Sequence, residues 1–194
     1  MIAGHFGFAA AVKARETATP LWALMLACVW LDVIFVPLFL SGVATIEKVP
    51  GAGPYGGGVI HADYTHSLVG ALALSLVLAL PAAWAWGTRS GVVVGLVAFS
   101  HWVLDLVVHR SDLPLLPGGA GDLPKLGFGL WRWPAASASV ELALVAAGAF
   151  LYWRAARAAT GEAGRGGWRA NLAALMILVF GCLVLALDVT GLAG

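Results

Sequence analysis

The chain has 194 residues, of which 61% are hydrophobic and only 11% are charged. A water-soluble domain of this length needs more charge on its surface, so the composition excludes that class and predicts an integral membrane protein. The formal net charge of +1 gives no reason to expect a nucleic-acid partner, which would favour a basic chain.

Apolar runs along the chain predict an all-α integral membrane protein with a single polytopic domain over residues 1–194. Residues 1–15 form a short apolar helix. At about 1.5 Å per residue it covers half a bilayer at most, which is typical of a re-entrant or interfacial helix. We then expect about five transmembrane helices, near residues 21–40, 66–86, 91–109, 135–153 and 170–187.

Two long loops join these helices. Residues 41–64 are rich in Gly and Pro, and residues 110–134 combine Gly, Leu and Trp, which is typical of a flap on the membrane surface. Because successive spans alternate in direction, both loops are expected on the same side of the membrane.

The distribution of basic residues predicts which side that is, because cytoplasmic loops carry an excess of Lys and Arg. The side of the N-terminal basic turn gathers seven basic residues: Lys13, Arg15, Arg89, Arg154, Arg157, Arg165 and Arg169. The other side has four: Lys48, Arg110, Lys125 and Arg132. We therefore expect the N-terminal basic turn inside the cell and the C-terminus outside.

A histidine and an aspartate lie one helical turn apart inside the third predicted span. His101 and Asp105 follow an uninterrupted apolar run, and residues four apart share one face of a helix. Burying both in hydrocarbon costs several kcal/mol unless each is paired or bound to a metal ion. The pair therefore predicts a polar site within the bilayer.

Three other residues are expected at a similar depth, in the outer half of the bilayer. His5 and Asp32 lie in the first two apolar segments, and His66 begins the second span. Histidine nitrogens and carboxylate oxygens together are the ligands that zinc and similar divalent ions take. We therefore predict that His5, Asp32, His66, His101 and Asp105 bind a divalent ion. The alternative is that each aspartate forms a structural hydrogen-bonded bridge with a histidine.

Four other polar residues are candidates for supporting this site or for contacting a substrate: His61, His109, Arg110 and Glu141. His61 is expected in a loop at the mouth of the site. His109 lies two helical turns beyond His101, where simple solvation also accounts for it. For Glu141, near the outer end of the fourth span, a hydrogen-bonded carboxylate is the alternative.

Two short motifs resemble those of a known family. The segment His61-Ala-Asp-Tyr-Thr-His-Ser67 is similar to the H-R-G-x-T-H-S element of the YdjM-type bacterial membrane proteins, and Ser100-His-x-x-x-Asp105 to their S-H-x-x-x-D element. His5 and Asp32 also stand in that family's order, and the resemblance covers roughly residues 1–118. These proteins are regarded as membrane-bound metal-dependent hydrolases, which implies the same activity here and a place in the bacterial cytoplasmic (inner) membrane.

The order of the candidate ligands is also similar to that of zinc-dependent phospholipases C and zinc single-strand nucleases. By that analogy Asp32, His66, His101 and Asp105 hold one zinc ion, and Asp105 bridges to a second ion shared with His5. Ala62 and Asp63 replace the Arg-Gly of the first element, and the later His-x-x-x-Glu pair of the soluble enzymes is absent from the sequence. One or two zinc ions are therefore expected rather than three.

The sequence leads to one main hypothesis and two alternatives. The main one is a membrane-embedded metal-dependent hydrolase of a lipid or lipid-linked phosphoester, with Asp32 or Asp105 accepting a proton from water. An ion- or proton-coupled transporter would use the same residues as a relay, but no inverted repeat is visible. A non-catalytic membrane subunit would use them to hold a structural metal ion.

Overall fold

Apolar α-helices make up most of the protein, as the all-α expectation requires. The computed structural model describes residues 1–121, 123–160 and 167–192. Of these residues 69% are helical, nearly all of them in seven α-helices. Four helices are long and apolar enough to cross a membrane: α4 (Leu68–Trp86), α5 (Thr88–Val108), α6 (Pro134–Thr160) and α7 (Gly167–Thr190). The last two are longer at both ends than the apolar runs indicated.

The segment expected to form the first span is a broken helix. It consists of α2 (Leu21–Cys28) and α3 (Trp30–Leu40), which are bent by 48° relative to each other. Val29 leaves the helical conformation at the break, with φ −117° and ψ 13°. Its side chain differs little from its apolar neighbours, so hydropathy alone could not locate the break. If the bent pair counts as one span, the described part of the chain has up to five segments that are long and apolar enough to cross a membrane.

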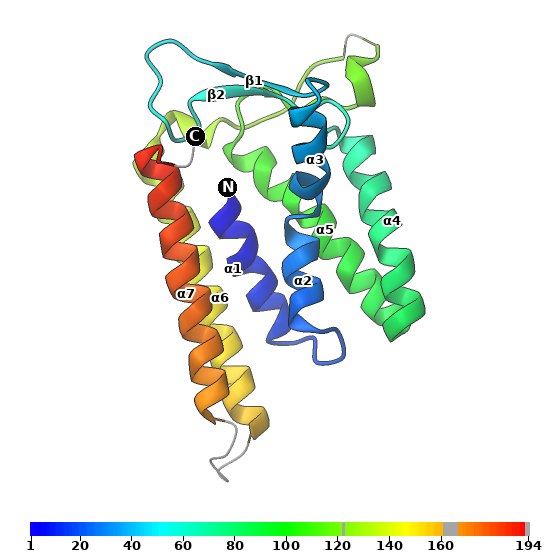
Figure 1. Ribbon diagram of the computed structural model, residues 1–194, viewed down its shortest axis with the longest axis vertical. Helices are drawn as coiled ribbons and strands as arrows, with labels where there is room; N and C mark the ends of the chain where they lie inside the picture. Colours follow the sequence, from blue (N-terminus) through cyan, green and yellow to red (C-terminus); the bar gives the residue numbers. More distant parts are fainter. Residues whose placement is uncertain (122, 161–166, 193–194) are drawn as a thin grey trace.

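The short N-terminal helix α1 (Ile2–Lys13) lies in the middle of the bundle, between the α6–α7 pair and α2 (Figure 1). Its close packing depends on glycines. A Cβ atom at Gly7 would collide with the backbone of Leu144 in α6, and one at Gly148 would collide with the backbone of Gly7. Without those side chains the two backbones touch, as is common between helices in membranes. This contact fixes where α1 enters the bundle.

A β-hairpin covers one end of the bundle, in the region expected to be a Gly/Pro-rich loop (Figure 1). Strands β1 (Thr45–Lys48) and β2 (Gly58–His61) pair antiparallel, with Thr45 opposite His61. β-Branched residues occur in both strands, and they favour extended backbone. The hairpin and its connecting loop, residues 49–57, form a roof over the helices below, and we call this end of the bundle the hairpin end.

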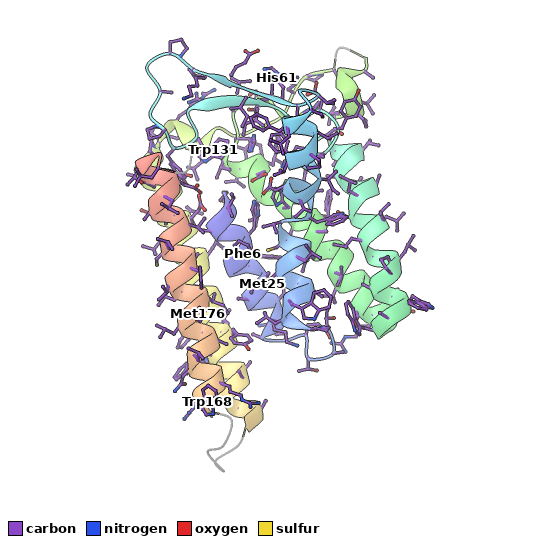
Figure 2. All side chains as sticks on the ribbon, viewed as in Figure 1. Phe6, Met25, His61, Trp131, Trp168 and Met176 are labelled. Carbon is purple, nitrogen blue, oxygen red and sulfur yellow. The ribbon has the colours of Figure 1, made fainter. Side chains whose placement is uncertain are left out.

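The second long loop also lies at the hairpin end. Its carbonyl groups at Pro114 and Leu115 accept hydrogen bonds from the first two backbone N–H groups of α4, at 3.0 and 3.2 Å. These bonds satisfy donors that a helix N-terminus cannot satisfy itself. Farther along, the 3₁₀ turn η2 (Leu130–Arg132) carries Trp131 beneath the hairpin (Figure 2).

Apolar side chains fill the bundle farther from the hairpin. A buried cluster joins α1, α2, α4 and α5, with Phe6 and Met25 packed against it (Figure 2). Its buried members are Ala9, Leu24, Ala27, Cys28, Ala82, Val94, Val97 and Ala98.

The basic residues expected on the inner side belong to helix ends and turns opposite the hairpin. Arg89 lies at the start of α5, and Arg157 in the last turn of α6. Trp168 marks the same end of α7 in Figure 2. Arg165, which was counted with this group, lies outside the described residues.

A buried carboxylate organises the turn between α1 and α2 at that end. Glu16 Oε1 accepts backbone hydrogen bonds from Ala18 (3.0 Å) and Thr19 (3.4 Å), and Oε2 accepts one from Arg89 Nε at 3.1 Å. Burial disfavours the charged form, but these donors and the Arg89 charge outweigh it and lower the pKa of Glu16. The turn is thereby tied to the start of α5.

Replacing Gly148 by valine should separate α1 from α6 and destabilise the protein, because the new side chain meets the Gly7 backbone rather than a flexible side chain. Overpacking of this kind costs about 1–3 kcal/mol. Thermal unfolding in detergent measures the loss. The matched variant Ala147→Val adds bulk at the neighbouring, exposed position of the same helix and should leave the melting temperature nearly unchanged. Equal melting temperatures for the two variants would contradict the close contact between α1 and α6.

The Glu16 contacts predict acid-sensitive stability. A carboxyl whose pKa is lowered by folding stabilises the protein above its unfolded pKa, near 4.5, and this contribution disappears as the pH falls through the lower folded value. Melting temperatures recorded from pH 6 downward should therefore converge for wild type and Glu16→Gln at acid pH, with wild type more stable at pH 6. Curves that stay parallel over the whole range would contradict this role.

Candidate metal centre

The five residues predicted as metal ligands converge at one point below the hairpin. His5 comes from α1, Asp32 from α3, and His101 and Asp105 from α5, whereas His66 lies in the turn just before α4. All five line the same cavity. Residues up to 100 positions apart in the chain are therefore neighbours.

Asp105 is at the centre of the first group of contacts. Its Oδ1 lies 3.1 Å from His5 Nε2, and its Oδ2 lies 3.1 Å from His101 Nε2. All three side chains are buried, and the two imidazole rings stack with their centroids 3.8 Å apart. Within this group one nitrogen of each histidine and a carboxylate oxygen lie within 4.8 Å of one another, close enough to share one metal ion.

A second group shares His101. Asp32 Oδ1 lies 3.4 Å from His66 Nε2 and 3.6 Å from His101 Nε2, and these two nitrogens are 3.3 Å apart. These three residues also lie close enough together to hold a metal ion. Asp32 is the most exposed of the five, with about a third of its side chain accessible, so this group faces the cavity.

The break between α2 and α3 fixes the orientation of His101. The Cys28 carbonyl, at the last residue of α2, accepts a hydrogen bond from His101 Nδ1 at 2.8 Å. Since a carbonyl only accepts, Nδ1 carries a proton, and Nε2 points at the carboxylates. Metal-binding histidines are commonly held in this way by a carbonyl on the other ring nitrogen.

His66 is fixed by two contacts. Its Nδ1 lies 2.8 Å from Thr65 Oγ1, and its backbone carbonyl accepts the Trp102 indole N–H at 2.9 Å. Its Nε2 therefore faces His101 and the two aspartates. Within the described part of the chain, His5 Nδ1 has no hydrogen-bond partner, so the ring is held by its contact with Asp105, its stacking on His101 and the packing of α1.

The donor set fits a divalent cation. His101 Nε2 faces two carboxylate oxygens and a second histidine nitrogen. Two carboxylates buried together need a positive charge between them, from protonated histidines or from a metal ion. A metal ion supplies that charge and takes both kinds of ligand. These buried His/Asp groups can therefore hold a metal ion.

His109 lies next to the cluster, and it contacts Asp112, a residue that the sequence analysis did not identify. His109 Nδ1 lies 2.9 Å from Asp112 Oδ1, and Asp112 Oδ2 accepts the backbone N–H of Ile60 in β2 at 3.0 Å. His109 Nε2 lies 3.8 Å from Asp105 Oδ2. The spacing of His109 and Asp112, three residues apart at a helix end, is the signal that could have revealed the pair.

The other three supporting candidates lie away from the cavity lining. Glu141 is fully buried and accepts hydrogen bonds from the Gly4 N–H and the Tyr55 hydroxyl. Arg110 Nη2 donates to the Gly56 carbonyl at 3.4 Å. His61 lies on the hairpin, where its Nε2 is 3.5 Å from Glu47 Oε1 (Figure 2).

The cavity has a volume of about 670 Å³ and extends from the His/Asp cluster to the roof. Its wall is polar at the cluster and largely apolar elsewhere, with Phe35 from α3 and Leu187 from α7. Lys48 lines it from β1 and Asp188 from the end of α7. Trp131, which the sequence analysis placed only in a surface flap, packs against the His109 ring with centroids 4.4 Å apart.

Comparison with known proteins gives no relative: no family model, no curated protein and no solved structure matches the chain.

Metal content is the first quantity that this geometry predicts. Elemental analysis of the detergent-purified protein should find roughly one or two zinc or similar divalent ions per chain. His101→Ala and Asp105→Ala should each lose the metal, because each removes a residue at the centre of the cluster. His61→Ala, which lies outside the cavity lining, should keep it. Full metal content in both cluster variants would contradict this site.

Proposed function

We propose that the protein is a membrane-embedded metal-dependent hydrolase that acts on a lipid or lipid-linked phosphoester. The observation that carries the proposal is the arrangement at His101, whose Nδ1 donates to a carbonyl while Nε2 faces Asp32 and Asp105. A purely hydrogen-bonded bridge needs a second proton, on His101 Nε2, which makes the ring an imidazolium. A metal ion would take the place of that proton and would bind the carboxylates and His66 as well.

The chemistry proposed is the activation of water. A divalent ion in such a site lowers the pKa of a water molecule and polarises a phosphoryl oxygen. His5, Asp32, His66, His101 and Asp105 would hold the ion or ions, with both oxygens of Asp105 directed at histidines. Asp32 directs Oδ1 at the histidines and is partly open to the cavity, so it is the better placed of the two aspartates to accept a proton from water.

The shape and lining of the cavity favour an amphipathic substrate. A phosphoester group would reach the His/Asp cluster, and an apolar chain would lie along Phe35 and Leu187. Lys48 supplies a positive charge for an anionic headgroup. A cavity of about 670 Å³ accommodates a lipid headgroup with part of its chain, and it is large for a site that only encloses a structural ion.

The position of the cluster speaks against a transporter. A proton or ion relay needs polar groups along the whole path through the membrane. On the side away from the hairpin, however, the bundle is filled by the apolar cluster around Ala98 and Cys28. The polar residues therefore form a site that opens toward one end of the bundle, as a hydrolase requires.

We further propose the membrane arrangement. The bent α2–α3 pair would form one of five spans, and α1 would enter the bilayer without crossing it. The hairpin end would face outward from a bacterial cytoplasmic membrane, because the basic residues Arg89 and Arg157 lie at the opposite end. The two motifs that resemble the YdjM-type proteins, around His66 and His101, support this setting and zinc as the ion.

Hydrolase activity can be tested with synthetic lipid phosphoesters in mixed micelles. The metal-loaded wild type should release water-soluble phosphate products, and Asp105→Asn should lower the rate at least about 100-fold because it weakens the central metal ligand. Asp32→Asn should lower the turnover by more than it lowers the metal content, since Asp32 would accept the proton as well as contact the ion. His61→Ala serves as the control and should retain wild-type activity.

Two results would count against this function. Equal turnover by wild type and Asp105→Asn would show that hydrolysis comes from elsewhere. A fully metal-loaded wild type that hydrolyses none of the phosphoesters would leave the metal site standing and favour the non-catalytic alternative.

A further inference from the structure

Glu141 is a carboxylate buried completely inside a helix of the membrane-spanning bundle, yet it does not line the cavity. Burying such a group in hydrocarbon costs several kcal/mol unless its oxygens are satisfied. An apolar residue at this position would avoid that cost. The contacts of its two oxygens therefore indicate what the carboxylate does.

One oxygen reaches the N-terminal helix. Glu141 Oε2 accepts the backbone N–H of Gly4 at 3.1 Å. Gly4 lies in the first turn of α1, where N–H groups have no partner within the helix. The next residue is His5, whose Nε2 approaches Asp105 at 3.1 Å. Since His5 Nδ1 has no partner in the described part of the chain, the backbone anchor at Gly4 adds a second fixed point to the His5–Asp105 contact.

The other oxygen reaches the roof. Glu141 Oε1 accepts the hydroxyl of Tyr55, which also lies 3.0 Å from Ser137 Oγ, one helical turn earlier in α6. Tyr55 lies in the loop that joins the two strands and lines the cavity. A single carboxylate thus connects α6 to the helix that carries His5 and to the loop that covers the site.

We propose that Glu141 is a positioning residue that holds His5 at the metal centre and the loop of residues 49–57 over the cavity. The part concerning metal rests on the proposed function. Two independent tethers meet at one side chain, so loss of the carboxylate should release both segments, whereas loss of the Tyr55 hydroxyl should release only the roof.

The experiment compares Glu141→Ala, Glu141→Gln and Tyr55→Phe with wild type by hydrogen–deuterium exchange in detergent. Glu141→Ala should speed exchange in both α1 and residues 49–57. Glu141→Gln retains an oxygen for Gly4 and an amide for Tyr55, so it should restore slow exchange in both. Tyr55→Phe should speed exchange in the loop alone. Ser139→Ala, at an exposed polar position of the same helix, is the matched control.

A cobalt titration followed by its visible absorption tests the link to the metal. Glu141→Ala should bind Co²⁺ about tenfold more weakly than wild type, and Glu141→Gln should recover the wild-type spectrum and affinity. An unchanged exchange rate in α1, or equal Co²⁺ binding by Glu141→Ala and wild type, would overturn the proposal. If wild type itself binds no Co²⁺, the proposed metal-dependent function fails, while the exchange comparison still decides whether Glu141 tethers the two segments.

Discussion

The central constraint on this structure is the electrostatic cost of placing two aspartates and three histidines in the apolar interior of a helical bundle. Both carboxylates lie within 3.6 Å of His101 Nε2, whose other nitrogen donates to the Cys28 carbonyl. In a low-dielectric medium two carboxylates repel one another strongly. A positive charge between them, from a bound cation or a protonated imidazole, turns this repulsion into attraction. The surrounding backbone can be understood as the means of holding these five groups together.

Two irregular features of the backbone serve that end. Because the helix breaks at Val29, the Cys28 carbonyl is available to accept a hydrogen bond from His101. The short α1 helix begins inside the bundle rather than at its surface, and its contact with α6 through Gly7 and Gly148 brings His5 to the depth of Asp105. A regular spanning helix at either place would lack these contacts.

A second set of buried polar contacts joins the roof to the helices. Asp112 connects His109 with β2, and Glu141 connects α1 with Tyr55 in the loop between the strands. Each contact buries polar groups, and only complete hydrogen bonding offsets the free-energy cost of removing them from water. These contacts attach the hairpin and its connecting loop, which cover the cavity, to the helices beneath it.

The sequence by itself determined the helical membrane character, because long apolar runs have few other stable forms, and it indicated which polar residues were costly to bury. It also identified the pair in α5, since residues four apart on a helix are neighbours. The break at Val29, the hairpin and the roles of Tyr55 and Asp112 depended on tertiary structure. Val29 differs little from its apolar neighbours in the chain, and the partners of Tyr55 lie 82 and 86 residues away, so no local pattern encodes those contacts. Hydropathy indicates that a segment is kept away from water, whereas the packing of the folded chain decides which residues it contacts.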